Sequence, residues 1–242
     1  MPPVPTGYQC LFITVYTERI LYMKFPFFAS FIVFCIWLSH QLKKSRKLQE
    51  KKEKSFWDLE NQANNTRRKS LANLNYITIP LESFPMELSA LPNEATISPQ
   101  GKALLAECME TLQSLSTVKI VNFTGLTNTE LKLQYGAPNI NLLMEFDQNY
   151  TLLARTLQTF AEELFKAGLV SEAKTVLEFA ISTHTDVSQS YFLLADIYER
   201  EHQPEKIEAL ITVAESLNTV MKKSIVRTLQ ESGPYSGLLR SS

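Results

Sequence analysis

Residues able to form disulfides or bind metals are scarce in this sequence. Its 242 residues include 3 cysteines, at positions 10, 35 and 108, and 3 histidines, at positions 40, 184 and 202. There is neither a CxxC pair nor a His-Cys cluster to bind a metal, and so few cysteines cannot build a disulfide framework. We interpret Cys108 as a small core residue, because Leu105, Met109 and Leu112 recur with it at helical spacing.

Motifs of known catalytic chemistry are also missing. There is no Gly-rich phosphate loop, no GxSxG and no HExxH. Glu162 and Glu163 are adjacent rather than one turn apart, so we interpret them as a solvated helix face and not as an acid/base pair. His184 and His202 fall in expected turns. We therefore predict a protein that is not an enzyme and has no cofactor or metal.

One long stretch lacks formal charge, from Phe25 to Leu42. At about 1.5 Å per residue it extends roughly 27 Å, near the thickness of a bilayer core. A buried core helix does not fit the lysines that follow, and a cleaved signal peptide lacks a small-residue cleavage site. The sequence thus predicts a transmembrane helix over residues 23–42, after an uncertain leader, 1–22, that we hypothesise precedes the true start at Met23.

Charge is divided along the chain. Residues 43–69 contain 10 Lys or Arg and 4 Asp or Glu, a net +6, whereas residues 70–242 contain 12 and 20, a net −8. Basic residues stay on the cytoplasmic side and attract anionic lipid. We expect a single-pass membrane protein with its N-terminus outside, its C-terminal domain cytoplasmic, and lipid contacts through the anchor and basic segment. The acidic C-terminal part argues against nucleic acid as a partner.

Further segments follow the apolar stretch. Residues 43–70 should form a basic juxtamembrane helix, in which Phe56 and Trp57 are either part of a solvated spacer or a docking site. Residues 71–97 contain prolines and should form a linker, with Tyr76, Ile77 and Ile79 as apolar contacts to the domain. Residues 98–242 should form a helical domain.

Several local signals place the helices of that domain. Ser98 and Pro99 are an N-cap and first helical residue, and Thr127 with Glu130 matches a capping box. We expect a β-like run at VKIVNF, a short helix near 139–147, a longer one from Tyr150 to Ala167 that ends at Gly168, and a last helix at about 220–231.

A repeat appears when the chain is shifted by 34 residues. The shift aligns apolar residues in pairs: Leu157 with Tyr191, Phe160 with Leu194, Ala161 with Ala195, Leu164 with Tyr198, Ala173 with Ile207, Leu177 with Ile211 and Ala180 with Ala214. The pattern resembles the tetratricopeptide repeat, a 34-residue pair of antiparallel helices. His202 stands where the family has its turn glycine, which is Gly168 in the first copy. The resemblance implies repeats at about 154–187 and 188–221 and a capping helix, and it leaves open one degenerate repeat before them.

In this family the first helices line a groove that takes a peptide. The matching positions are Arg155, Gln158, Glu162, Phe165, Lys166, Gln189, Phe192, Asp196 and Glu199. Glu162 and Asp196 stand where carboxylate-binding members have asparagine, so the resemblance does not favour a C-terminal carboxylate. With three carboxylates, two basic residues and two phenylalanines, the positions favour a basic peptide with an apolar anchor.

Two functions follow from this reading. The first is a membrane-anchored cytoplasmic adaptor or scaffold that binds a protein or peptide through the groove. The second is a structural subunit of a membrane assembly that uses the anchor and the segment at Phe56 and Trp57. We also hypothesise that Arg67, Arg68 and Lys69 fold back onto the acidic repeats and compete with an external ligand.

Overall fold

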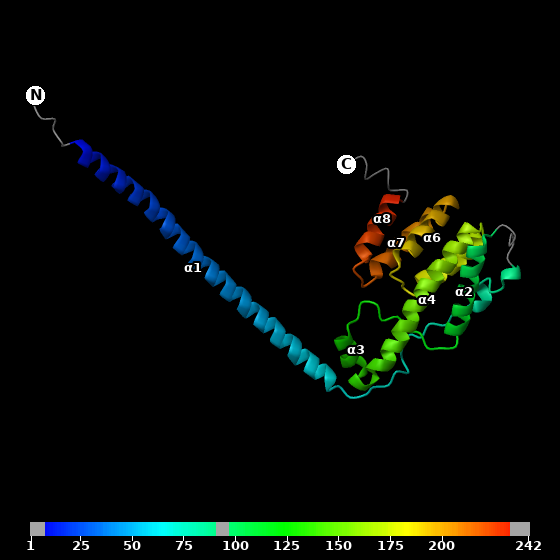
Figure 1. The fold of residues 1–242 in the computed structure, drawn as a ribbon. Helices are drawn as coiled ribbons and strands as arrows, with labels where there is room; N and C mark the ends of the chain where they lie inside the picture. The colour runs from blue at the N-terminus through cyan, green and yellow to red at the C-terminus, as the bar shows by residue number, and fades with distance from the viewer. Residues whose placement is uncertain (1–7, 91–96, 233–242) are drawn as a thin grey trace, which may run out of the picture. The chain divides into compact units, whose positions relative to one another are not determined.

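The computed structural model describes the backbone of residues 8–90 and 97–232, and the side chains of residues 28–89 and 97–231. The chain divides into two compact units, Met1–Asn61 and Gln62–Ser242, which are described separately. The elements along the chain are α1 (Tyr8–Asn64), η1 (Leu81–Ser83), η2 (Leu88–Ala90), α2 (Pro99–Leu115), α3 (Asn128–Tyr135), η4 (Ala137–Asn139), α4 (Ile140–Lys166), α5 (Val170–Ser182), α6 (Ser188–Arg200), α7 (Pro204–Ser216) and α8 (Lys222–Ser232) (Figure 1). The fold is mainly α, as predicted.

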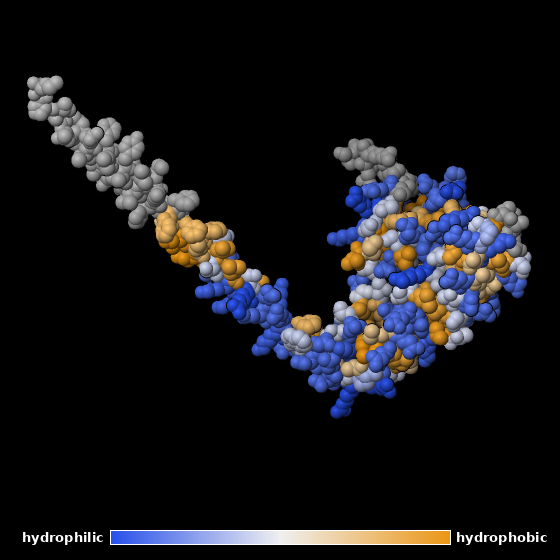
Figure 2. Space-filling model, viewed as in Figure 1, coloured by the Kyte–Doolittle hydropathy of each residue, from blue (hydrophilic) through white to orange (hydrophobic). Residues whose placement is uncertain are grey.

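The first unit consists of one continuous helix, α1, which also includes residues 8–22 of the expected leader. Its described apolar side chains are exposed, among them Phe28, Phe34 and Trp37. Figure 2 shows them as an orange stretch followed by the blue of the basic residues. Arg46 and Glu50 form an i,i+4 ion pair of 3.3 Å on this basic part, which adds a few tenths of a kcal/mol to the helix.

The predicted transmembrane helix over residues 23–42 is wrong. Among the residues that the structure describes, no helix is both long and apolar enough to cross a membrane. The side chains of residues 23–27, with which the predicted segment begins, lie outside the described residues. The described apolar run from Phe28 to Leu38 extends about 16 Å, roughly half of a bilayer core. The prediction added Ser39, His40 and Gln41 to its length, although all three are polar.

In the second unit, α2 lies antiparallel on α4. The start of α2 is near the end of α4, because a Cβ at Gly101 would lie 3.4 Å from Oε2 of Glu163. At the other end, the side-chain amide of Asn149 donates to the carbonyl of Lys119, at 3.0 Å. Both predicted caps are confirmed: Ser98 accepts from the backbone N–H of Gly101, and α3 begins with the full capping box.

Two local predictions around α4 are wrong. The helix does not break between residues 147 and 150 but continues from Ile140 to Lys166, because neither glycine nor proline occurs in that range to stop it. The run VKIVNF forms no strand. Its Ile120 and Val121 are buried, and the carbonyl of Ile120 accepts from the N–H of Ile77 at 2.9 Å. It is therefore an extended connection packed on the helices.

Helices α4 and α5, and then α6 and α7, form two consecutive hairpins whose turns have the same backbone geometry. The N–H of Leu169 donates to the carbonyl of Leu164, and that of Gln203 to Tyr198, each at 2.9 Å. The donor and the acceptor of the second bond each lie 34 residues after those of the first. Gly168 and His202 occupy the same turn position, with φ of 79° and 55°. A 6→1 bond around a positive-φ residue is the Schellman ending of a helix, so the 34-residue period exists in the backbone as well as in the sequence.

The core of the second unit is built from the positions of that period. Leu157, Leu164 and Tyr191 are buried, and Ala180 and Ala214 are both 0% exposed. Small residues here allow adjacent helices to approach closely. Helix α8 packs on α6 and α7 through the buried Ile225 and Leu229. It begins two residues later and extends one residue further than the expected 220–231.

Residues 71–84 run along the domain outside any α-helix or strand, with the 3-10 helix η1 near their end. As predicted, Tyr76, Ile77 and Ile79 contact the domain: Tyr76 packs edge-on against Phe146, with ring centroids 5.9 Å apart. Phe84, which the sequence analysis did not select, is buried and meets Phe179 of α5 at 5.6 Å. The segment is therefore part of the folded unit and not a free linker.

Candidate binding surface on α4, α6 and α8

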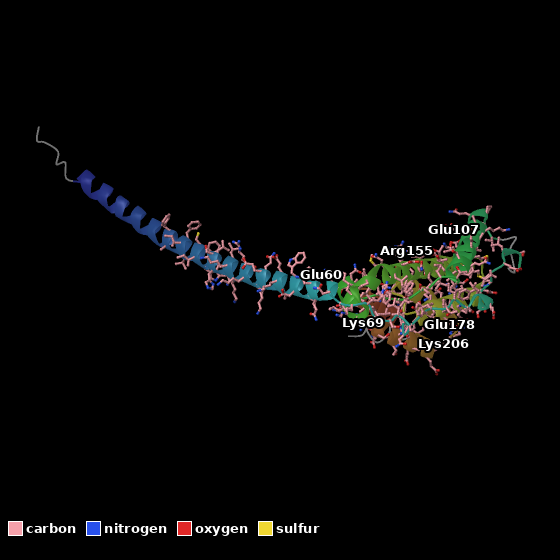
Figure 3. The ribbon with its side chains drawn as sticks, turned by 90° about the horizontal axis from the view of Figure 1, so that it is seen from below. Glu60, Lys69, Glu107, Arg155, Glu178 and Lys206 are labelled. Atoms are coloured by element: carbon pink, nitrogen blue, oxygen red, sulfur yellow. The ribbon has the colours of Figure 1, made fainter. Side chains whose placement is uncertain are left out.

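The nine groove candidates lie on α4 and α6. Arg155, Glu162, Lys166, Gln189 and Glu199 are exposed, and the other four are half-buried. Figure 3 shows Arg155 on α4 well away from Glu178 and Lys206, which form a 3.5 Å ion pair between α5 and α7. Arg155 therefore lies apart from the surface formed by Glu178 and Lys206 on the second helices of the hairpins.

Two contacts join the candidate positions of α4 to those of α6. Oε1 of Gln158 accepts a hydrogen bond of 2.7 Å from the buried hydroxyl of Ser190. Farther along, the guanidinium of Arg200 lies 5.1 Å from the ring centroid of Phe165. The structure thus brings Gln158 and Phe165 alongside α6. Gln158 already accepts a hydrogen bond and Phe165 already contacts Arg200, so each side chain can make fewer contacts with a ligand.

Arg200 is the residue of this surface that sequence reasoning missed. Besides covering Phe165, it forms a 2.8 Å ion pair with Asp196, one helical turn earlier. The i,i+4 spacing of Asp196 and Arg200 is visible in the sequence, but the resemblance to known repeats did not select position 200. Because Arg200 lies over the ring of Phe165, this ring is less accessible to an apolar side chain of a ligand.

The acidic character expected of the groove is largely neutralised. Lys166 forms ion pairs of 2.9 Å with both Glu162 and Glu163. Its hydrogen bond to Glu162 raises the pKa of Lys166 most, and the one to Glu163 raises it further. Asp196 is paired with Arg200. Within the described part of the chain, Glu199 is the groove carboxylate that makes no ion pair. Negative charge without an ion-pair partner is therefore available at one end of the surface and not along all of it.

A pocket of about 200 Å³ opens at that end. Its lining combines three helices: Phe192, Ala195, Asp196 and Glu199 from α6, Ile207 from α7, and Thr228 and Leu229 from α8. Three of the predicted groove residues line it together. The contributions of Ile207, Thr228 and Leu229 were not predicted, because they require α7 and α8 to fold against α6.

The candidate docking residues on α1 are exposed. Phe56 and Trp57 are 54% and 61% exposed, and their rings meet edge-to-face at 5.7 Å. Exposed apolar side chains that lie next to one another can mark a surface for contact with a partner. They stay candidates for contact with a partner.

The expected fold-back of residues 64–74 onto the repeat groove is wrong. The N–H and Nζ of Lys69 donate to the carbonyls of Tyr135 and Leu133, at 3.1 and 2.9 Å, at the end of α3. The side-chain amide of Asn139 donates to the carbonyl of Lys69 at 2.9 Å. Arg67 and Arg68 are exposed in the same segment. These contacts hold the segment at α3, and Figure 3 shows Lys69 well separated from Arg155.

No group of metal-binding side chains occurs among the described residues. Cys108 is buried as predicted, and burial, followed by the nearby charges of Glu107 and Glu163, raises its pKa to about 11. A thiol with so high a pKa is protonated at neutral pH and is a poor nucleophile.

We compared the chain with known proteins in three ways. No protein-family model, no curated protein and no solved structure matches it.

Proposed function

We propose that the second unit is a protein-interaction module that binds a peptide segment of a partner across the exposed faces of α4 and α6, next to α8. The protein would then act as an adaptor or scaffold. In this proposal the two hairpins are tetratricopeptide-like repeats and α8 is their cap. The chemistry of binding is polar contact along the surface, with one side chain of the peptide seated in the pocket at Glu199.

The observation that supports this proposal most is the equivalence of the two hairpins. Their turns repeat after 34 residues in hydrogen bonding and in φ, and their small core residues repeat as well. This repetition sets α4 and α6 side by side, connected through Gln158–Ser190 and Phe165–Arg200. A regular, exposed surface made by successive helices is what stacked repeats use to bind extended partners.

Selection of a random peptide library on the purified full-length protein tests the proposal. The affinity of the selected peptides is then measured by fluorescence anisotropy on the wild type and on a triple variant, Arg155→Ala, Gln189→Ala and Glu199→Ala. These three side chains are exposed, so truncating them should leave the fold intact. We expect the triple variant to weaken binding at least about tenfold, since a few contacts dominate such interfaces.

A matched variant controls for general effects on the surface. Glu110→Ala, Gln113→Ala and Glu205→Ala change exposed residues of α2 and α7 and should leave affinity within a factor of about two. If both triple variants weaken the peptides equally, or if the library gives no peptide that depends on the first set, the surface on α4 and α6 does not bind peptides.

The alternative function is that of a structural subunit that contacts its assembly through α1. The exposure of Phe56 and Trp57 specifically favours it. Substituting both by serine should abolish assembly in this case and leave peptide binding by the second unit unchanged. Contact between the basic residues 43–54 and anionic lipid stays a prediction, and a vesicle-sedimentation assay that compares neutral with anionic vesicles would measure it.

A further inference from the structure

The pocket at the end of the candidate surface has a chemistry of its own. Its lining is apolar over most of its extent, with Ala195, Ile207 and Leu229 at 8%, 4% and 1% exposure. Phe192 adds an aromatic side chain that is half-buried. Polar groups enter from one helix turn, Asp196 and Glu199, and from Thr228. The lining contains no basic residue.

The charge available to a ligand comes from Glu199. Asp196, at the i,i+3 position, is already paired with Arg200 at 2.8 Å. Two other charged residues near Glu199 in the sequence form ion pairs with α5: Glu201 with Lys174, and Lys206 with Glu178. Among the described residues Glu199 therefore remains as one carboxylate at the mouth of an apolar pocket.

The end of α6 adds to this negative charge. Glu199 is in the last turn of α6, and the C-terminal end of a helix carries partial negative charge that attracts cations. Ile207 is near the start of α7, which carries partial positive charge, so the preference for a cation depends on Glu199 and the end of its own helix.

The size of the pocket limits the occupant. At about 200 Å³ it is smaller than the roughly 300–1,000 Å³ of most small-molecule sites. It has room for one long side chain, and the apolar walls suit an alkyl stem whose charged end reaches the pocket mouth. A carboxylate ligand would meet Glu199, and an apolar side chain would leave the Glu199 charge without a partner.

We infer that this pocket selects a lysine or arginine side chain of the bound partner, with its aliphatic stem against Phe192, Ile207 and Leu229 and its cationic end paired with Glu199. This inference deepens the proposed function and rests on it for the biological setting. It also narrows the expectation of a basic partner: the preference for positive charge acts at one position of the peptide, because the other carboxylates of the surface are paired within the protein.

The pocket can be tested apart from the rest of the surface with short peptides. The probes are Ac-Ala-Ala-Xaa-Ala-Ala-NH₂, where Xaa is arginine, lysine, norleucine or glutamate, titrated into the ¹⁵N-labelled full-length protein. We expect arginine and lysine peptides to shift the amide signals of Ala195 and Leu229. Norleucine, which keeps the stem and removes the charge, should bind about two- to fivefold more weakly, as is typical of losing an ion pair with an exposed carboxylate such as Glu199.

Substitution of the carboxylate supplies the second arm. Glu199→Gln keeps the size of the side chain and should remove the preference for arginine over norleucine, whereas Glu205→Gln, an exposed change in α7, should not. The inference is overturned if norleucine binds as well as arginine, if Glu199→Gln leaves the preference unchanged, or if no probe shifts these signals at millimolar concentration.

Failure of this inference can be told from failure of the proposed function. If library peptides depend on the triple-alanine set but show no preferred basic position, the surface binds peptides and the pocket has no such specificity. If the short arginine peptide fills the pocket but the library peptides do not depend on the surface, the pocket recognises a basic side chain and the extended peptide site on α4 and α6 is rejected.

Discussion

Gly136 holds a sharp turn against which an earlier part of the chain is packed, and Gly136→Ala should undo that packing. The residue has φ of 95° and ψ of 136°, a backbone region that is nearly exclusive to glycine. A Cβ at this position would lie 2.8 Å from Cα of Arg68 and closer still to the carbonyl oxygen of Arg67. Both neighbours are backbone atoms, so a side-chain rotation cannot relieve the overlap.

The size of the effect follows from two contributions. The unfavourable backbone conformation costs about 1–3 kcal/mol. Moving the segment at Arg67 also breaks the bonds from Ala137 N–H to the Thr66 carbonyl and from Lys69 N–H to the Tyr135 carbonyl, each 3.1 Å and each worth about 1 kcal/mol. The sum is about 3–5 kcal/mol for Gly136→Ala.

Gly168→Ala is the matched control. Gly168 also has a positive φ, of 79°, but nothing lies within 4 Å of the position of its Cβ. The cost there is the backbone conformation alone, about 1–2 kcal/mol. Urea unfolding followed by circular dichroism gives both free energies of unfolding, and hydrogen exchange at the Lys69 amide should accelerate only in Gly136→Ala. Equal losses in the two variants, with the Lys69 amide still protected, would refute the reasoning.

Two further predictions concern the core. Ala180→Leu should lower the free energy of unfolding by about 1–3 kcal/mol because Ala180 is fully buried, whereas Ala106→Leu, the same change at an exposed helical position, should have little effect in thermal unfolding; similar results would show that the helices do not approach closely at position 180. The pKa of Cys108 is raised from 9.0 to about 11, so the folded state keeps a proton that the unfolded state loses, and stability should fall as pH rises from 9 to 11, by an amount on the order of 1–3 kcal/mol. Unfolding measured against pH should show this loss in the wild type and a flatter profile in Cys108→Ala; parallel profiles would rule out a contribution from the thiol.

The caps, the buried thiol and the 34-residue period could be predicted because each depends on residues close together along one helix or on a spacing of apolar side chains. Ser98 bonds to a residue three positions on, and Thr127 and Glu130 satisfy one another. Sequence patterns of this range determine where helices begin and which face is apolar. The transmembrane prediction depended on the length of an uncharged stretch, and among the described residues no helix is long and apolar enough to cross a membrane.

Contacts between distant parts of the chain were decided by the tertiary structure. Arg200 meets Phe165, the segment at Lys69 binds the end of α3, and the pocket at Glu199 needs Ile207 and Leu229 from two later helices. Composition and periodicity predict on which face of its own helix each of these residues lies. They do not predict which residue elsewhere in the chain that face contacts. That neighbour depends on how the helices pack, so packing created the pocket beside Glu199, whereas the ion pairs of Lys166 and Asp196 lie within single helices.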